Sequence, residues 1–218
     1  MRINKFIAQA TGLSRRAADQ AVGEGRVTIN QRPATLGATA DDTDTVMLDN
    51  QPIALPAKTV TIMINKPAGY VTSRAGQGSQ TVYDLLPADL HRLKPIGRLD
   101  KDSSGLLLLT NDGDLANQLT HPRYAKEKVY EVTLDKPLAN EHKTRLETGV
   151  ALDDGLSSLR IDNVNGQSLR VTMSEGRNRQ IRRTFSALGY NVLQLQRTQF
   201  GPYRLDQLAP TQRYSVLD

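Results

Sequence analysis

Residues 95–109 read PIGRLDKDSSGLLLL, a polar loop that leads directly into an apolar segment. The leucines at 106–109 form the longest uninterrupted apolar run of the chain, and a run of this length is typical of a buried strand. Side chains in a loop directly before a buried strand are held by a rigid element, which is a common position for catalytic groups. The stretch therefore predicts a core strand with a candidate site in the loop before it.

Three chemistries are compatible with the carboxylates of this loop. The spacing of polar residues from Asp100 to Gly105 matches the opening of an EF-hand calcium loop, but Asn111 stands where that loop needs a bidentate glutamate. Magnesium-dependent phosphoryl transfer would add Asp112 and Asp114, which are better explained as a turn residue and a helix cap. The third chemistry is a single carboxylate that acts beside an arginine without a metal.

A second unusual stretch, Glu175–Arg183, is rich in arginine. If a helix opens at Asn178, the side chains of Arg179, Arg182 and Arg183 share one face at positions i, i+3 and i+4. Like charges at that spacing repel, so the arrangement indicates an anion nearby, either an RNA backbone or a buried aspartate. This favours the third chemistry, in which one carboxylate lies next to an arginine.

The N-terminal part has the pattern of a small, separate domain. Apolar residues at helical spacing predict a short helix that ends at Gly12, followed by a helix that Ser14 caps and Gly25 ends. Short alternating segments at 27–29 and 46–48 predict two strands of a hairpin. A helix pair with a hairpin is enough for a compact module.

After a proline-containing linker at 52–57 the pattern changes to strands mixed with short helices. Strands are predicted at 59–64, 106–110, 129–134, 169–173 and 192–195, and helices at 114–119, 140–148 and 178–188. Without strict strand–helix alternation, this order predicts an α+β fold rather than a doubly wound one. We therefore expect domains at residues 1–57 and 58–218.

Composition excludes several classes of site. The chain of 218 residues contains no cysteine, which rules out disulfides, thiolate metal sites and cysteine nucleophiles, and its three histidines lie far apart. No apolar run approaches the ~20 residues of a membrane span. The first residues also lack the apolar block of a secretory signal. We expect a cytoplasmic protein with no membrane partner.

The net charge of +5 is concentrated in two regions. Residues 1–32 carry six basic and two acidic residues, and residues 160–204 carry eight arginines against two acidic residues. Two such patches indicate a polyanion as partner. Arg15 and Arg16 begin the predicted second helix, where unpaired backbone N–H groups and guanidinium groups can grip phosphates together.

These motifs carry a specific resemblance. Ile96–Asp100, followed by Ser104–Leu106, resembles the catalytic motif of the pseudouridine synthases. Lys66–Gly69, the strand around Tyr130 and Gly176–Arg183 resemble the accompanying motifs of that family, in the same order. The similarity spans nearly the whole chain.

Two further segments resemble one branch of that family. Leu13–Arg16 and Gly25–Asn30 are similar to the αL RNA-binding module of ribosomal small-subunit protein four. That pairing is typical of the synthases that modify a single uridine in ribosomal RNA. Arg197–Leu205 also resembles the synthases that act on large-subunit rRNA.

The resemblance implies a small αL RNA-binding domain followed by a mixed, mainly antiparallel β-sheet flanked by helices. It implies isomerisation of a specific uridine in rRNA, with Asp100 as nucleophile or general base and Tyr130 stacked on the flipped-out uracil. Arg182 would pair with Asp100, and Arg98 would fill the space that the base leaves. The remaining RNA contacts are expected from basic residues: Arg15, Arg16, Arg26, Lys66, Arg177, Arg179 and Arg183.

Pseudouridine formation breaks a C–N glycosidic bond and joins C5 of the uracil to the same sugar carbon. Nothing is oxidised, phosphorylated or hydrolysed overall, so we expect neither a metal nor a cofactor. Asp102 lies two residues beyond Asp100, and we interpret it as a structural residue at the end of a turn. The expected partner is ribosomal RNA or a ribosome-assembly intermediate, and we expect a monomer.

Two other functions remain open from the sequence. A non-catalytic RNA-binding or ribosome-assembly protein would retain the fold, but binding alone needs no carboxylate inside a basic cleft. A metal-dependent nuclease is the second alternative. Activity that survives EDTA without strand scission would exclude the nuclease.

Overall fold

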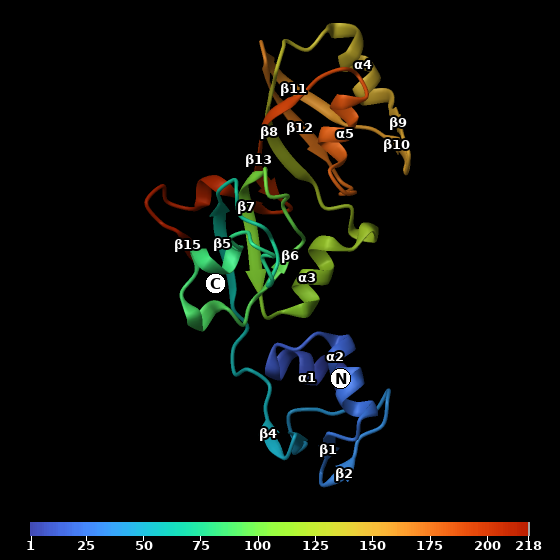
Figure 1. Ribbon diagram of the computed structural model, residues 1–218, viewed down its shortest axis with the longest axis vertical. Coiled ribbons are helices and arrows are strands. Elements are labelled where there is room, and N and C mark those ends of the chain that lie inside the picture. Colours follow the sequence, from blue (N-terminus) through green and yellow to red (C-terminus); the bar gives the residue numbers. More distant parts are fainter. Residues whose placement is uncertain (218) are drawn as a thin grey trace. The chain divides into compact units, whose positions relative to one another are not determined.

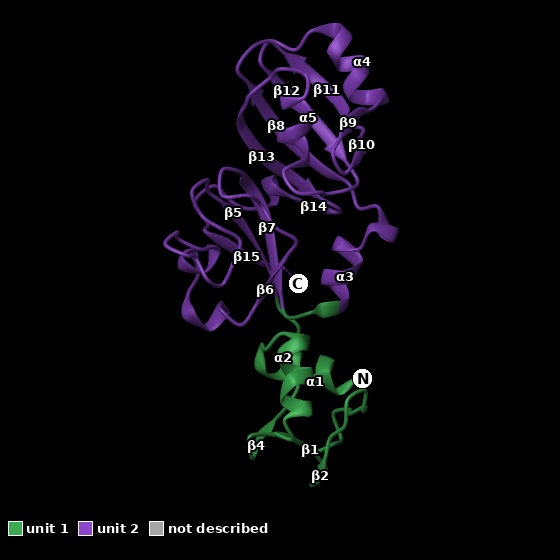
Figure 2. Cartoon of the chain, turned by 45° about the vertical axis from the view of Figure 1, so that its right-hand side comes forward, with its two compact units in different colours: residues 1–60, 111–113 green, residues 61–110, 114–218 purple. Residues whose placement is uncertain are grey.

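The computed structural model describes residues 1–217, which form two compact units. The first unit contains residues 1–60 together with 111–113, and the second contains the rest (Figure 2). No helix in the described part of the chain is both long and apolar enough to cross a membrane.

The first unit is a helix pair packed on a small sheet. Helices α1 (Ile3–Thr11) and α2 (Arg15–Gly23) cover a four-stranded sheet in the order β2-β1-β3-β4. The strands are β1 (Val27–Ile29), β2 (Arg32–Pro33), β3 (Val46–Leu48) and β4 (Gln51–Ile53).

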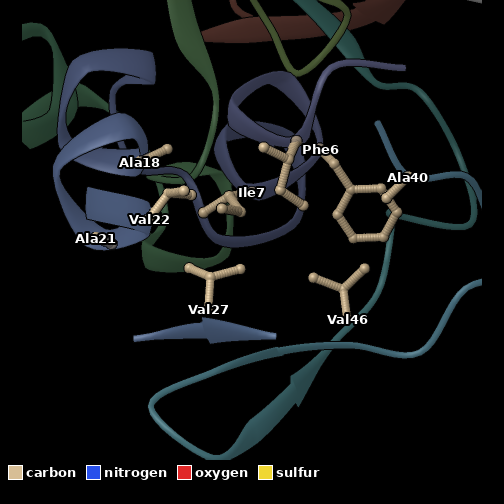
Figure 3. Packing of buried hydrophobic residues seen from close by; sticks show 9 residues of the cluster. Phe6, Ile7, Ala18, Ala21, Val22, Val27, Ala40 and Val46 are labelled. Atoms are coloured by element: carbon tan, nitrogen blue, oxygen red, sulfur yellow. The ribbon is translucent and has the colours of Figure 1, made fainter. Parts of the chain in front are cut away.

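Local signals in the sequence set the helix ends of this unit. Gly12 ends α1 with φ +80°, and Ser14 caps α2 by accepting the Ala17 N–H at 3.0 Å, as predicted. Figure 3 shows Ile7 of α1 next to Val22 of α2 and above Val27, and Phe6 of α1 next to Ala40 and above Val46. Burial of this apolar cluster holds the helices on the sheet.

The second unit is built on one nine-stranded sheet (Figure 1). Seven strands follow the order β11-β12-β8-β13-β7-β5-β15, with β14 paired to β13 and β6 to β7. Their bounds are β5 (Thr61–Lys66), β6 (Lys94–Ile96), β7 (Ser104–Thr110), β8 (Lys128–Leu134), β11 (Arg160–Asn165), β12 (Ser168–Met173), β13 (Val192–Phe200), β14 (Tyr203–Arg204) and β15 (Tyr214–Leu217). A separate hairpin consists of β9 (Val150–Leu152) and β10 (Gly155–Ser157).

Short helices connect these strands: α3 (Gly113–Thr120), α4 (Asn140–Thr148), α5 (Gln180–Ser186) and the 3₁₀ helices η1 (Val82–Leu85), η2 (Ala88–Leu90), η3 (Pro122–Tyr124) and η4 (Leu205–Gln207). All pairings within the described sheet are antiparallel except that of β13 with β7. The predicted mixed, mainly antiparallel α+β fold is confirmed.

Several predicted boundaries differ from the structure: the strand expected at 59–64 runs over Thr61–Lys66, the strand expected at 192–195 extends to Phe200, and β4 occupies the start of the expected linker. The helix expected from Asn178 begins only at Gln180, because Arg179 adopts a left-handed conformation with φ +46° and cannot be part of the first turn. Asp114 lies inside α3 rather than before it, so it is not the residue that precedes the helix. The leucines at 106–109 are fully buried in β7, as predicted.

Strand β7 meets β13 at a position that only glycine can occupy. Gly105 has φ +104°, and a Cβ added there would lie 2.2 Å from the carbonyl oxygen of Arg197. This close approach lets Arg197 pair with Gly105 and, on its other side, with Tyr130 of β8. The loop at 97–103 therefore ends next to the strands that carry the remaining residues of the site.

Candidate active site

A cavity of about 490 Å³ lies in the second unit and collects the main predicted site residues. Its wall includes Asp100 from the loop before β7, Tyr130 from β8, Arg179 from the segment before α5, and Arg197 from β13. The volume falls within the ~300–1,000 Å³ typical of small-molecule pockets. The cavity is therefore large enough for one base with its sugar.

The loop that carries Asp100 is fixed by its own backbone and by one threonine. Leu99 is buried, and Thr72 Oγ1 both donates to the Leu99 carbonyl at 2.9 Å and accepts its N–H at 3.2 Å. The Ser103 N–H donates to the Asp100 carbonyl at 3.1 Å and closes a turn. These bonds hold the Asp100 carboxylate, about one third exposed, at the cavity wall.

Arginines on and before α5 bind this loop, but not in the predicted pairing. Arg179 makes a bidentate contact to the Asp102 carboxylate at 2.9 Å for both bonds, and its Nη1 lies 3.8 Å from Asp100 Oδ2. Arg182 lies 3.3 Å from Asp102 Oδ2 and donates to the Asp102 carbonyl at 2.9 Å and to the Val192 carbonyl at 2.7 Å. The expected ion pair between Arg182 and Asp100 is therefore wrong.

The physical reason is that the guanidinium group of Arg182 already donates hydrogen bonds to two backbone carbonyls. Two backbone carbonyls fix its guanidinium against β13 and the end of the loop turn, which leaves Asp100 to Arg179. Asp102 acts as the anchor for both arginines. The hydrogen bonds from Arg179 lower the pKa of the Asp102 carboxyl, so it stays charged in this role.

Tyr130 lies at the end of a core stripe. Alternate residues Tyr130, Val132 and Leu134 of β8 are buried, and Tyr130 retains 8% exposure where the stripe reaches the cavity. Tyr130 is therefore both a core residue of the sheet and part of the cavity wall. Arg98, in contrast, is exposed and lines the same cavity.

Comparison with known proteins gives two matches within the chain. Residues 60–187, which include the loop of Asp100, Tyr130 and α5, match the family described as RNA pseudouridylate synthase. The chain belongs to this family. Its members isomerise uridine to pseudouridine in RNA. Residues 1–46 match the S4 domain, an RNA-binding module, so RNA is the macromolecular partner of this synthase.

Individual relatives are similar over most of their length. The chain is 36% identical to an uncharacterized RNA pseudouridine synthase of Aquifex aeolicus, over 96% of this chain and 88% of the relative. It is 36% identical to ribosomal large subunit pseudouridine synthase B of Bacillus subtilis, over 91% and 85%. It is also 36% identical to ribosomal small subunit pseudouridine synthase A of Yersinia pestis, over 96% and 92%.

A solved crystal structure of a pseudouridylate synthase has the same fold. The TM-score is 0.71 at 30% sequence identity, and the match covers 100% of this chain and 96% of the other.

One predicted RNA contact of the synthase is wrong. Lys66 is fully buried, and its Nζ donates to the Ser103 carbonyl at 2.6 Å and to the Pro67 carbonyl at 3.0 Å. Burial lowers the pKa of Lys66 to about 8. An ammonium group enclosed in this way cannot reach a phosphate. Lys66 instead supports the loop of Asp100 through its hydrogen bond to the Ser103 carbonyl.

Two other predicted RNA contacts are occupied by an internal partner. Arg177 and Arg183 both bind the carboxylate of Asp154, in the turn between β9 and β10, at 2.8 and 2.7 Å. Arg177 also donates to the carbonyls of Gly155 and Leu156. These arginines fix the β9–β10 hairpin. The anion expected near the arginine-rich stretch is thus, for both of them, the carboxylate of Asp154.

In the first unit, the predicted basic residues divide into two kinds. Arg15 and Arg16 are exposed in the first turn of α2, and Arg15 donates to Asn4 Oδ1 at 3.0 Å. Arg26 instead makes a bidentate contact to Asp49 at 2.6 Å and a further one to Glu24 at 3.0 Å. Two carboxylates thus already neutralise Arg26, while Arg15 and Arg16 make no salt bridge within residues 1–217.

Sequence reasoning assigned no role to Arg197, which the structure places in the cavity wall with only 2% exposure. A signal was present: in the alternating pattern of β13, Leu195 and Arg197 share the inward face. An arginine at an inward strand position is uncommon and marks a polar site.

Proposed function

We propose that the chain converts a uridine in ribosomal RNA to pseudouridine, with Asp100 as the nucleophile or general base. The observation that carries the proposal is that Asp100 and Tyr130, from separate elements, line one cavity of nucleoside size. The relatives named as ribosomal large and small subunit synthases support rRNA as the substrate.

The residue types suit the reaction. A carboxylate can capture the sugar carbon when the glycosidic bond breaks and can then accept a proton. Arg179 and Arg182, both bound to Asp102, give the Asp100 carboxylate a cationic setting without covering it. Part of its surface stays open to the cavity for the substrate.

The uridine has to leave its stack before it can enter. Extruding a base costs a few kcal/mol, and stacking on an aromatic ring returns about 1–3 kcal/mol. We assign that stacking surface to Tyr130. Arg98, exposed at the same cavity, has a planar guanidinium that can stack on a base left behind.

Beyond the cavity, we assign phosphate contacts to Arg15 and Arg16. Both are exposed at the N-terminus of α2, where backbone N–H groups also point outward. Arg179 binds Asp102 with two hydrogen bonds, so we assign it no phosphate contact although its side chain is 43% exposed. The other basic residues of the predicted set are held by internal partners.

Of the two ribosomal RNAs, we assign large-subunit rRNA as the substrate. It is supported by the segment Arg197–Leu205, which resembles the large-subunit branch, whereas the named relatives include synthases for both subunits. Chemical mapping of pseudouridine in both rRNAs, with and without the protein, distinguishes them. Modification confined to small-subunit rRNA would contradict this assignment.

The central test is Asp100→Asn. We expect pseudouridine formation to be abolished while the Kd for rRNA changes little, because the amide keeps the shape of the side chain and loses its charge. Asp206→Asn is the matched control, since Asp206 is exposed and pairs with Arg204 away from the cavity. A wild-type protein that binds rRNA and forms no pseudouridine would support the non-catalytic alternative.

The nuclease alternative is tested in the same assay. We expect wild-type turnover to persist in EDTA with no cleavage of the RNA. Strand scission that EDTA stops would refute the proposed chemistry. Running free rRNA and isolated ribosomal particles in parallel decides which is the substrate.

A further inference from the structure

Arg197 is a buried cation without a carboxylate. Its side chain is 2% exposed, and Nε donates to the Leu106 carbonyl at 2.9 Å. Nη2 is buried with no hydrogen-bond partner in the described part of the chain. Burying a charge that has no counter-charge is strongly unfavourable, and an arginine cannot avoid this by losing its proton.

Other arginines of the cavity wall do not share this feature. Arg177 lies 2.8 Å from a carboxylate oxygen of Asp154, and Arg179 lies 2.9 Å from one of Asp102. Among residues 1–217, no carboxylate lies within salt-bridge distance of Arg197. Within the described chain, no counter-charge therefore offsets the unfavourable burial of Arg197.

Arg197 and a second cation, Lys128, both lie against the aromatic ring of Phe200. Arg197 Cζ lies 4.8 Å and Lys128 Nζ 5.3 Å from the centre of the Phe200 ring, and all three residues line the cavity. Lys128 reaches only backbone carbonyls, at 3.3 to 3.4 Å. Burial, with the charge of Arg197, lowers the pKa of Lys128. The cavity wall thus holds two neighbouring cations without an ion-pair partner in the described chain.

The position of Arg197 also relates it to the stacking surface. In the register of β8 and β13, Tyr130 and Arg197 are directly opposite each other, so their side chains leave the same face of the sheet. A base stacked on Tyr130 would have its edge near this guanidinium. A backbone phosphate would remain nearer the cavity mouth, where Arg98 is exposed.

We infer that Arg197, assisted by Lys128, binds a carbonyl oxygen of the target uracil and stabilises the negative charge that the ring carries after it leaves the sugar. The inference rests on the proposed function. Breaking the C1′–N1 bond leaves its electron pair on the uracil, where it is shared between N1, O2 and O4, and the Asp100 carboxylate forms a bond to C1′. After the ring turns, C5 bonds to C1′ as the carboxylate leaves. The freed Asp100 carboxylate then accepts the proton from C5 and returns it, directly or through solvent, to N1, which restores the ionised carboxylate.

Donors fixed in place before charge develops are the most effective stabilisers of such a charge, and removing one typically lowers kcat by ~10²–10³-fold. We therefore expect Arg197→Gln to reduce the single-turnover rate by about that factor while the Kd for rRNA stays within about 3-fold of the wild type. Arg170→Gln is the matched control, because Arg170 is exposed on β12 and pairs with Glu131. Its turnover should be unchanged.

A second substrate separates charge stabilisation from a structural role. Fluorine at C5 withdraws electrons and makes the uracil anion more stable on its own. An RNA with 5-fluorouridine at the target should therefore depend less on Arg197, and consumption of 5-fluorouridine should fall ~10-fold less in Arg197→Gln than turnover of the uridine substrate does. A variant that only distorts the site would slow both substrates equally.

The outcomes are distinct. No pseudouridine from the wild type would refute the proposed function itself. An active wild type with unchanged turnover in Arg197→Gln, or with equal losses on both substrates, would overturn only the inference. A loss of rRNA affinity with a salt dependence weaker by about one phosphate contact would assign Arg197 to the backbone and overturn it as well. If Arg197→Gln does not fold, Lys128→Gln is tested on the uridine and 5-fluorouridine RNAs instead. Equal losses on both substrates would overturn the inference.

Discussion

Lys66→Met tests the buried ammonium group under the loop of Asp100. In the folded state the pKa of Lys66 falls from its ordinary value of 10.5 to about 8, because burial disfavours the charged form. Between these two pH values the unfolded chain binds the proton more tightly than the folded chain, so the stability contributed by this residue rises with pH. At about 1.4 kcal/mol per pKa unit the whole difference is worth ~3 kcal/mol, of which ~2–3 kcal/mol develops between pH 7.5 and pH 10.

The assay is urea unfolding of wild type and variant at both pH values, since the midpoint and slope together give the free energy of unfolding. We expect wild type to gain ~2–3 kcal/mol over Lys66→Met as the pH rises from 7.5 to 10. Other groups that titrate in this range are common to both proteins and cancel in the difference. Lys58→Met, which removes an exposed lysine, should show no such gain. A stability difference between wild type and Lys66→Met that is the same at both pH values would refute the reasoning.

Three further predictions follow from the contacts. Replacing Arg15 and Arg16 together by alanine should weaken rRNA binding and reduce the slope of log Kd against log salt by at most about two, measured by titration at several salt concentrations; an unchanged slope would exclude phosphate contacts. Gly105→Ala should destabilise the fold by ~3 kcal/mol or more in urea unfolding, because the new Cβ would lie 2.2 Å from a β13 carbonyl oxygen at a φ of +104°, and a loss below ~1 kcal/mol would contradict the described fit. Asp102→Asn should lower kcat by ~10²-fold with little change in the Kd for rRNA, because Arg179 loses the charge that holds it beside the loop of Asp100. An unaltered kcat would show that this anchor is dispensable.

Patterns local in sequence predicted the fold class and a candidate site in the loop before β7, whereas the roles of Tyr130 and Arg182 came from the resemblance to the pseudouridine synthases. The polar loop before β7, the cap at Ser14 and the inward alternation around Tyr130 each depend on residues near one another in the chain. Seven strands with only two to four residues each went unpredicted: β2, β4, β6, β9, β10, β14 and β15. Their pairing partners lie elsewhere in the chain or across a turn, so local alternation is too short to reveal them. The six-residue β11 was missed as well, because its segment Arg160–Asn165 is mostly polar.

The errors at the site have a common cause. Lys66 reads as a surface cation because lysine is rarely buried, and only the packing of β5 under the loop shows otherwise. The choice between Asp100 and Asp102 as the partner of Arg182 is a question of a few ångströms within one turn. Residue spacing cannot resolve that distance, whereas the two carbonyls that hold Arg182 determine it.

The single parallel pairing in the described sheet, between β7 and β13, joins segments about ninety residues apart in the chain. Asp100 precedes one of these strands, while Tyr130 is carried by the neighbour of the other. The strands β11-β12-β8-β13 lie on one side of this pairing and β7-β5-β15 on the other, and neither half alone holds both residues. Under the proposed function, a chain in which this junction has not closed would lack an assembled site, so turnover would report that β7 and β13 have paired.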